Sequence, residues 1–253
     1  MSYIKKRNSI LIFGASGFIG SNIASFFENK YSIIRLKIDA NFELLKNSIA
    51  CADIIIHAAG VSRSENESDF FKVNIEFSNR LFLLLSEHKN KRIIYFSSVH
   101  YNSDSIYGFS KRYNEYLLRN DILNKHNECI CVRTPGVFGP GSRPNYVSVV
   151  STFCYNLANN VASKIIDYDK VIDLIFVGDI LRMIESSILK PYSNGFKVIE
   201  PKSVQISVGE LYSLIHKISI DKNIDLTEDG FIKQIILTFK YYKNNAESKC
   251  IIE

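Results

Sequence analysis

The chain has few of the features that membrane, metal-binding or disulfide-stabilised proteins require. No run approaches the roughly eighteen apolar residues of a membrane-spanning helix, so we expect no membrane span. The five cysteines include no Cys-x-x-Cys pair and the five histidines have no metal-ligand spacing. We therefore expect no metal site, reduced thiols, histidines on the surface or in loops, and a cytoplasmic location. The 31 Lys and Arg residues form no basic stripe, which argues against nucleic-acid binding.

A glycine-rich turn near the N-terminus is the first informative feature. The apolar run 10–13 leads directly into Gly14-x-x-Gly17-x-x-Gly20 and then into a helical segment. Glycines at this spacing let a backbone turn sharply and approach a pyrophosphate, which then lies on free helix N–H groups. The alternative is a tight strand-to-helix turn without a ligand. The expected cofactor contacts are those of the turn and the first helical positions: Gly14, Ser16, Gly17, Phe18, Ile19 and Gly20.

The next strand, expected over 32–38, bears on the choice of dinucleotide. Asp39 follows it, about twenty residues after the glycines, where an acidic side chain accepts hydrogen bonds from the adenosine ribose of NAD. Arg35 and Lys37 lie close enough to neutralise the 2′-phosphate of NADP instead. We expect NAD or NADP, with a slight preference for NAD.

Small and polar residues follow two further buried strands. The strand 53–60 ends in Ala58, Ala59 and Gly60, which leave room for a flat ligand against the backbone. In the next helix, Asn74 stands among leucines and phenylalanines, where it either faces solvent or reaches the carboxyl edge of the sheet. The strand 93–98 ends in Ser98, at the edge where open α/β sheets bind ligands.

A tyrosine and a lysine share one helical face shortly after this serine. Tyr107 and Lys111 are four residues apart, so both side chains project from the same side of a helix and Ser98 can converge on them. An isolated Tyr-x-x-x-Lys occurs often by chance. Together with the glycine turn and the upstream serine, it predicts a catalytic group of Ser98, Tyr107 and Lys111.

The alternation of strands and helices predicts an α/β fold, a Rossmann-type doubly wound parallel sheet with a small C-terminal α/β lobe for the substrate. We expect the dinucleotide-binding domain over 1–140 and the smaller lobe over 141–253, interleaved as one compact unit. In this lobe we predict a helix over 145–160, a strand over 197–199 and a final helix over 230–243. The apolar face of the final helix either packs internally or mediates a homodimer.

These motifs resemble the extended short-chain dehydrogenase/reductase family, which includes nucleotide-sugar epimerases, dehydratases and reductases. The segment 143–156 is similar to one in the capsule and O-antigen reductases that act on UDP-2-acetamido-2,6-dideoxy-hexos-4-uloses in the pathway to UDP-N-acetyl-L-fucosamine. In those enzymes a cupin domain follows the reductase domain. This chain ends before such a domain could begin, so the resemblance implies the reductase part alone.

The resemblance implies NAD(P)H-dependent reduction of the 4-keto group of a UDP- or dTDP-linked 6-deoxy sugar. Tyr107 would protonate O4, Lys111 would lower the pKa of Tyr107 and hold the cofactor ribose, and Ser98 would orient the carbonyl. Arg143 and Asn145, at a helix start, would bind the nucleotide diphosphate. Alternatively, that segment only packs the C-terminal lobe, with Phe153 and Tyr155 buried and Arg143 in solvent.

The chain departs from the family pattern in the loops that face the sugar. Gly136 stands where those relatives have Asn, Thr134 where they have Trp, and Asp39 at or beside the position of an arginine suited to NADPH. Two other functions therefore stay open. One is a nucleotide-sugar 4-epimerase with tightly bound NAD, and the other is a catalytically silent dinucleotide-binding protein with a regulatory role.

Overall fold

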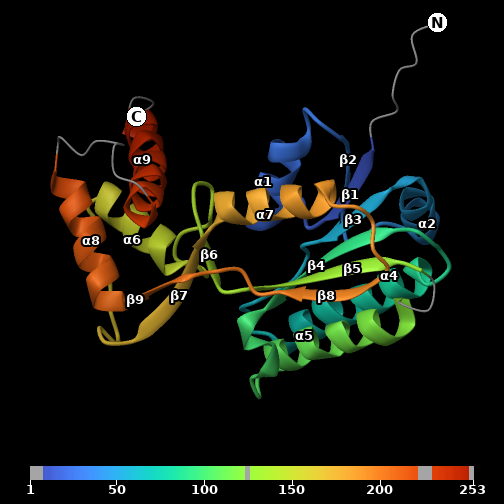
Figure 1. Cartoon of the computed structure of the whole chain (residues 1–253). Helices are drawn as coiled ribbons and strands as arrows, with labels where there is room; N and C mark the ends of the chain where they lie inside the picture. The colour runs from blue at the N-terminus through green and yellow to red at the C-terminus, as the bar shows by residue number, and fades with distance from the viewer. Residues whose placement is uncertain (1–7, 123–125, 222–229, 251–253) are drawn as a thin grey trace, which may run out of the picture. The chain divides into compact units, whose positions relative to one another are not determined.

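The computed structural model describes residues 8–122, 126–221 and 230–250, and the chain divides into two compact units (Figure 1). The first unit combines the residues up to Thr134 with Met183–Pro201, and the second contains Pro135–Arg182 and the residues from Lys202 onward. This division differs from a single boundary after residue 140, because the chain returns to the first unit late. The assignment of dinucleotide and substrate to separate parts of the chain stays a prediction.

The first unit is built on one sheet of six parallel strands in the order β2-β1-β3-β4-β5-β8. Its strands are β1(Ser9–Phe13), β2(Ser32–Leu36), β3(Ile54–His57), β4(Arg92–Ser98), β5(Glu128–Thr134) and β8(Gly195–Ile199). The chain order reverses on either side of β1, which confirms the doubly wound topology and places a switch point between β1 and β3. The strand expected over 197–199 was wrongly assigned to the C-terminal lobe, since β8 pairs with β5.

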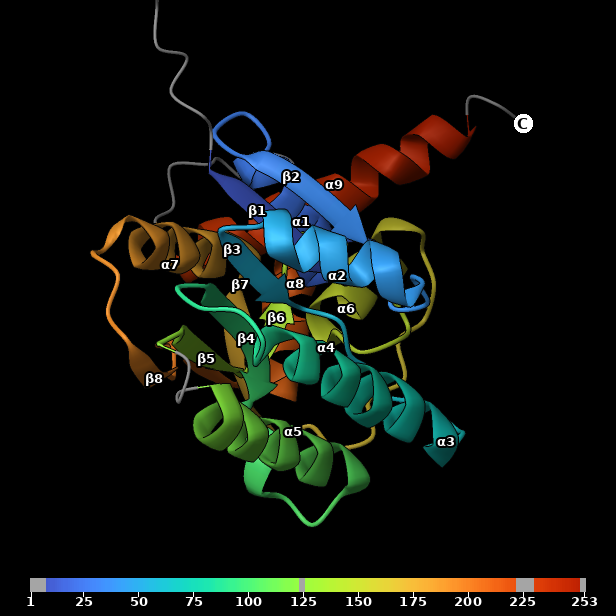
Figure 2. The same ribbon diagram turned by 90° about the vertical axis from the view of Figure 1, so that its right-hand side faces the viewer.

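Both faces of this sheet are covered, as its continuous apolar strands require. Figure 1 shows α4 and α5 on one face and α1 on the other. The helices of this unit are α1(Phe18–Phe27), α2(Phe42–Cys51), α3(Glu67–Asp69), α4(Phe77–Leu85) and α5(Ile106–Leu117). Leu11 and Phe13 of β1 pack with Leu45 of α2 and Leu81 of α4 in one core. Figure 2 shows the same sheet and its covering helices turned by 90°.

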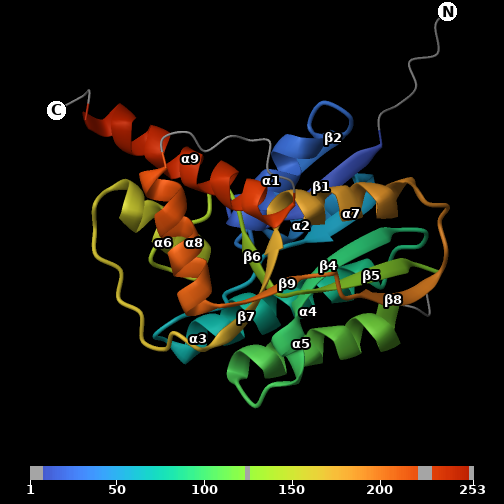
Figure 3. The same ribbon diagram turned by 60° about the vertical axis from the view of Figure 1, so that its left-hand side comes forward.

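The second unit has a mixed three-stranded sheet and three helices that share a core. Its elements are β6(Gly136–Phe138), α6(Val149–Ala158), β7(Val171–Phe176), β9(Val204–Ser207), α8(Val208–Ile220) and α9(Phe231–Cys250), and α7(Val177–Leu189) begins here and ends in the first unit. Figure 3 shows α6, α8 and α9 lying together. Ile235, Ile236 and Phe239 of α9 are buried among them, so this face packs internally, and the homodimer stays a prediction. No helix in the described ranges has the length and apolar character to cross a membrane.

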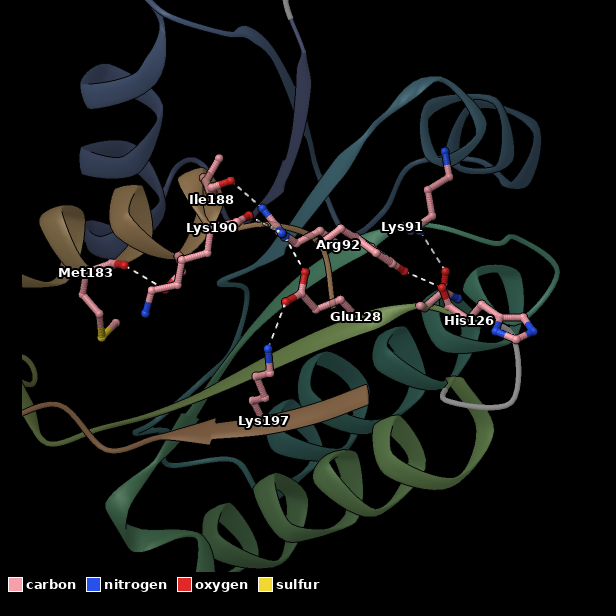
Figure 4. A network of polar contacts seen from close by, with 11 residues as sticks. Lys91, Arg92, His126, Glu128, Met183, Ile188, Lys190 and Lys197 are labelled. Atoms are coloured by element: carbon pink, nitrogen blue, oxygen red, sulfur yellow. Dashed lines mark hydrogen bonds and ion pairs between the residues drawn. The ribbon is translucent and has the colours of Figure 1, made fainter. Parts of the chain in front are cut away.

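A buried ion-pair network holds the amino ends of β4 and β5, and we call it the amino-edge clasp (Figure 4). Arg92 donates from Nε to Glu128 Oε2 over 2.6 Å and from Nη2 to the Lys190 carbonyl oxygen over 2.9 Å. It also donates to the carbonyl oxygen of Ile188. Lys197 Nζ lies 3.5 Å from the second oxygen of Glu128. The clasp therefore ties the end of α7 to the sheet through a guanidinium at the helix C-terminus.

Candidate functional site

The glycine turn after β1 leaves no space for side chains. A Cβ on Gly14 would lie 2.6 Å from the Ala59 nitrogen, and Gly14 has a φ of +83° that L-residues rarely adopt. A Cβ on Gly20 would lie 2.1 Å from the carbonyl oxygen of Gly14. The three glycines therefore let the backbone of this turn pack directly on the end of β3 and on the first turn of α1.

The start of α1 has the properties of a phosphate cradle. Gly17 is its N-cap residue and offers no side-chain cap, and the first turn carries no acidic residue. Its leading N–H groups and the positive end of the helix dipole are consequently available to an anion. Ser16 is exposed, and Phe18 and Ile19 are half-buried beside the turn. These observations fit the pyrophosphate of a dinucleotide.

The end of β2 presents two opposite charges with different surroundings. Asp39 is exposed in a turn three residues beyond the end of the strand. Arg35 is exposed as well, but its Nη2 lies 2.9 Å from Glu28 Oε2. The guanidinium thus already has a carboxylate partner, which makes it less available to a 2′-phosphate.

The small residues after β3 lie beside the predicted catalytic lysine. A Cβ on Gly60 would be 3.3 Å from Lys111 Nζ and 3.4 Å from Asn74 Oδ1. Asn74 is buried in the π-helical segment Phe70–Glu76, where its Oδ1 accepts from the Val61 N–H over 2.8 Å and its Nδ2 donates to the Val61 carbonyl over 2.9 Å. Of the two positions open to Asn74, the structure places it toward the carboxyl edge of the sheet, where it fixes the loop after β3.

Ser98, Tyr107 and Lys111 lie within one neighbourhood at the carboxyl end of β4. Ser98 Oγ accepts the His100 N–H over 3.1 Å. That hydroxyl also bonds with Tyr107. Lys111 is buried, donates from Nζ to the Phe96 carbonyl over 2.9 Å, and lies 5.7 Å from the centroid of the Tyr107 ring. The spacing argument therefore predicted the proximity of these three side chains correctly.

The electrostatics of this group differ from what we expected. Burial raises the pKa of Tyr107 above its ordinary value, and the hydrogen bond with Ser98 offsets only part of the rise. The pKa of Tyr107 is thus raised and not lowered as expected, because desolvation of the phenolate dominates. Burial also lowers the pKa of Lys111 to about 8, so this lysine titrates close to neutral pH.

Sequence reasoning missed His57, which we expected on the surface or in a loop. It ends β3, is buried, and its Nε2 lies 2.9 Å from Ser78 Oγ. Burial, followed by the charge of Lys111, lowers the pKa of His57 to about 3, so the ring is neutral. Its position at the end of a continuous apolar strand was the signal for a core residue.

Sequence reasoning also missed the charged residues around Ser97, which we call the carboxyl-edge network: Ser97, Tyr101, Glu115, Arg133 and Glu200. Ser97 Oγ donates to Glu115 Oε1 over 2.5 Å, so the hydroxyl of Ser97 is directed to this carboxylate. The signal was available, because Glu115 follows Lys111 by four residues on the same face of α5. Within the described residues, no cluster of three or more His, Cys, Asp or Glu could hold a metal ion.

Arg143 and Asn145 lie in the second unit, before α6 rather than within it. The helix expected from residue 145 begins at Val149 with Ser148 as its N-cap, so neither residue stands at a helix start. Arg143 is exposed with its Cζ 5.1 Å from the centroid of the Tyr146 ring. Asn145 is exposed with a φ of 55° and donates its N–H to Thr152 Oγ1 over 2.9 Å.

The alternative that this segment packs the C-terminal lobe is supported for its aromatic residues, since Phe153 is buried and Tyr155 packs against the core of the second unit. Nucleotide binding by Arg143 and Asn145 stays a prediction. A Cβ on Gly136, which departs from the family pattern, would lie 3.0 Å from the Asp173 carbonyl oxygen, so a larger residue would require this backbone to shift by a few tenths of an ångström.

Comparison with known proteins gives a consistent result. The model of the NAD dependent epimerase/dehydratase family matches residues 10–195. The UDP-2-acetamido-2,6-beta-L-arabino-hexul-4-ose reductase of Pseudomonas aeruginosa is 30% identical over 213 residues, which is 82% of this chain and 57% of that protein. The crystal structure of the capsular polysaccharide assembling protein CapF from Staphylococcus aureus is 28% identical with a TM-score of 0.78, over 92% of this chain and 64% of CapF.

A solved structure of lower sequence identity shares the fold. The UDP-glucose 4-epimerase of Thermus thermophilus, solved in complex with NAD, has a TM-score of 0.76 at 16% identity, over 93% of this chain and 99% of the epimerase. At that identity the likeness shows the fold alone. The present chain spans less than two thirds of the length of the reductase and of CapF.

Proposed function

The chain belongs to the NAD dependent epimerase/dehydratase family, and from this premise we propose that it reduces the 4-keto group of a nucleotide-linked 6-deoxy sugar. The observation that carries the proposal is the convergence of Ser98, Tyr107 and Lys111 at the carboxyl end of β4. The glycine turn after β1 would hold the dinucleotide that such a reaction requires. The similarity to a hexulose reductase supports a ketone substrate.

The raised pKa of Tyr107 keeps its phenol protonated near neutral pH, which is the form that a proton donor needs. When bound, the dinucleotide supplies the hydride that reduces the carbonyl carbon. The phenol of Tyr107 then gives its proton to the developing alkoxide, so the ketone becomes a secondary alcohol and the phenolate is left on the enzyme. Ser98 donates its O–H to the carbonyl oxygen and orients it. Protonated Lys111, buried beside Tyr107, stabilises the phenolate that forms.

For the cofactor we propose NAD(H), because Asp39 is free of a cationic partner in the contacts of the described residues while Arg35 is paired with Glu28. The exposed carboxylate is suited to a ribose 2′-hydroxyl, and it repels a 2′-phosphate. Ala58, Ala59 and Gly60 present backbone rather than bulky side chains beside the glycine turn, which leaves the flat adenine and nicotinamide rings space to lie.

The direct test is to incubate the protein with a panel of UDP- and dTDP-linked 4-keto-6-deoxy sugars and either NADH or NADPH. We expect loss of the reduced-nicotinamide absorbance and a 4-hydroxy product with at least one UDP sugar. A protein that carries NAD through gel filtration and interconverts 4-hydroxy epimers without consuming added NADH would be an epimerase. Dinucleotide binding without turnover of any sugar would indicate the silent, regulatory alternative.

Recognition of the nucleotide is tested at Arg143. An exposed guanidinium can pair with a diphosphate, so we expect Arg143→Ala to raise KM for the sugar nucleotide by about one to two orders of magnitude. Dinucleotide affinity and Tm should stay unchanged. Lys164→Ala, another surface cation of the same unit, serves as a control for net charge. Equal UDP affinities of wild type and Arg143→Ala, measured by titration, would remove Arg143 from the nucleotide site.

A further inference from the structure

The carboxyl-edge network joins three elements of the first unit around one carboxylate. Glu115 of α5 is buried, and its two oxygens accept from Arg133 of β5 over 3.1 and 2.7 Å. The first of these oxygens also accepts the hydroxyl of Ser97 in β4. Arg133 in turn donates to Glu200 over 2.9 Å. The pair thus consists of a buried carboxylate and a largely buried, bidentate guanidinium.

Three members of this network, Ser97, Tyr101 and Glu115, lie close in sequence to residues of the proposed catalytic group. Ser97 directly precedes Ser98, and its carbonyl accepts from Thr134 Oγ1 over 3.2 Å. The Arg133 guanidinium lies 3.5 Å from the centroid of the Tyr101 ring, in the turn that Ser98 caps. Glu115 follows Lys111 by one helical turn. A change in the network would therefore alter the surroundings of Ser98 at the end of β4 and of Lys111 within α5.

We infer that Glu115 and Arg133 are positioning residues for the proposed reduction, which orient Ser98 through Ser97 and Tyr101 and set a carboxylate one helical turn after Lys111. This inference rests on the proposed function. Neither residue contacts the position where we place the carbonyl; each acts through a neighbour. The arrangement needs both members, because removing either one would leave the charge of the other buried without a partner.

After burial, two groups bear on the pKa of Lys111: Cys131 first and then Glu115, and both raise it. Lys111 is surrounded by Tyr107 on its own helix, His57 at the end of β3, Tyr95 of β4 and Cys131 of β5. Burial keeps the imidazole, the phenols and the thiol uncharged near neutral pH, since it lowers the pKa of His57 and raises those of Tyr95, Tyr107 and Cys131.

With those groups uncharged, the Glu115 carboxylate is the negative charge that acts on Lys111. It raises the pKa of Lys111 and opposes the lowering by burial. Loss of this charge should therefore move the titration of Lys111 further below pH 8.

The test compares Glu115→Gln with Glu128→Gln, which removes the same charge from the same kind of buried pair in the amino-edge clasp. We expect Glu115→Gln to lower kcat about 10- to 100-fold, to leave KM for the dinucleotide unchanged, and to shift the alkaline limb of the pH profile of kcat to lower pH. Glu128→Gln should lower Tm but leave kcat and the pH profile as in wild type. Arg133→Lys, which keeps a cation, should retain more activity than Arg133→Met.

A second readout needs no substrate. The pKa of Lys111 can be followed by NMR of protein labelled at lysine Cε, with the resonance assigned by its loss in Lys111→Met. We expect a lower pKa in Glu115→Gln and an unchanged one in Glu128→Gln. Wild-type kcat and an unmoved Lys111 titration in a folded Glu115→Gln protein would overturn the inference. A wild type that reduces no sugar, with the Lys111 titration still moved by Glu115→Gln, would overturn the proposed function alone.

Discussion

The two ends of β4 and β5 carry buried Arg–Glu pairs of the same chemistry but with different neighbours. At the amino ends, Arg92 pairs with Glu128 across neighbouring strands, and the remaining donors of Arg92 reach backbone carbonyls at the end of α7. At the carboxyl ends, Arg133 pairs with Glu115, which also accepts from Ser97. The Arg92–Glu128 pair therefore holds backbone segments together, whereas the Arg133–Glu115 pair contacts neighbours of the side chains proposed for the reaction.

The difference shows that what a buried ion pair does depends on its remaining contacts. Desolvation offsets much of the Coulomb attraction in such a pair, so neither is a large net source of stability compared with an apolar replacement. The amino-edge clasp restrains Ile188 and Lys190, just before the chain enters β8. The carboxyl-edge network instead fixes groups whose orientation and charge would set the rate.

The largest expected effect is on stability at the amino edge. Arg92→Met leaves Glu128 buried with only the 3.5 Å contact to Lys197, so we expect the free energy of unfolding to fall by about 3–5 kcal/mol. Denaturant unfolding measures the loss, with Arg35→Met, an exposed pair, as a control that changes stability by less than about 1 kcal/mol. The double variant Arg92→Met/Glu128→Leu should recover most of the loss. A single variant as stable as wild type would show that the clasp is solvated.

The next effect separates stability from function at the carboxyl edge. The pKa of Lys111 is about 8 in the folded protein and 10.5 in its ordinary state. The unfolded chain thus binds more protons between these values, and the stability of wild type rises with pH from about 8 to 10.5. Lys111→Met lacks this dependence, so at pH 7 it should be more stable by on the order of 3 kcal/mol while losing activity.

Unfolding curves of wild type and Lys111→Met at about pH 7, 9 and 10.5 check this linkage. The gap in stability should shrink toward the highest pH, because the lysine is then neutral in the folded protein and only about half protonated in the unfolded chain. A constant gap across the series would mean that Lys111 does not titrate near pH 8 in the folded protein.

At the same edge, Tyr107→Phe removes the proposed proton donor and little else. We expect kcat to fall at least about a hundredfold while NADH affinity stays close to wild type, since the ring and its packing remain. Tyr116→Phe is the matched control, because Tyr116 lies on the same helix and is exposed. Near-normal turnover in Tyr107→Phe would place the proton donor elsewhere.

The features that sequence predicted well depend on local spacing. Three glycines after an apolar run and a Tyr-x-x-x-Lys pair specify a turn and a helical face, and both are present around Gly14 and Lys111. The parallel order of the sheet followed from the alternation of elements. Position 197–199 was misplaced because its partner strand, β5, lies more than sixty residues earlier, and no local pattern specifies such a pairing.

The features that sequence did not predict depend on burial. The pKa of Tyr107 was expected to fall because the neighbouring cation was visible in the sequence, whereas desolvation, which raises it, was not. The partner of Glu115 is likewise absent from its own helix, because Arg133 comes from β5. Arg143 lies before α6 and not at its start, since Ser148 rather than Asn145 caps the helix.

The smallest expected effect is on the choice of cofactor, and it tests whether the charged residues at the carboxyl end of β2 select NADH over NADPH. Asp39 stands exposed beyond this strand, and Arg35 is held by Glu28, so the exposed carboxylate should favour a ribose diol over a 2′-phosphate. We expect wild type to bind NADH more tightly than NADPH, and Asp39→Ala to narrow the ratio of the two Kd values by about tenfold, or roughly 1.4 kcal/mol.

Glu28→Gln is the informative companion, because it frees Arg35 while leaving Asp39 in place, and it should improve NADPH binding alone. Fluorescence titration of both dinucleotides against the three proteins gives the comparison. A wild-type preference for NADPH would show that Arg35 or Lys37, rather than Asp39, governs recognition at this end of the sheet.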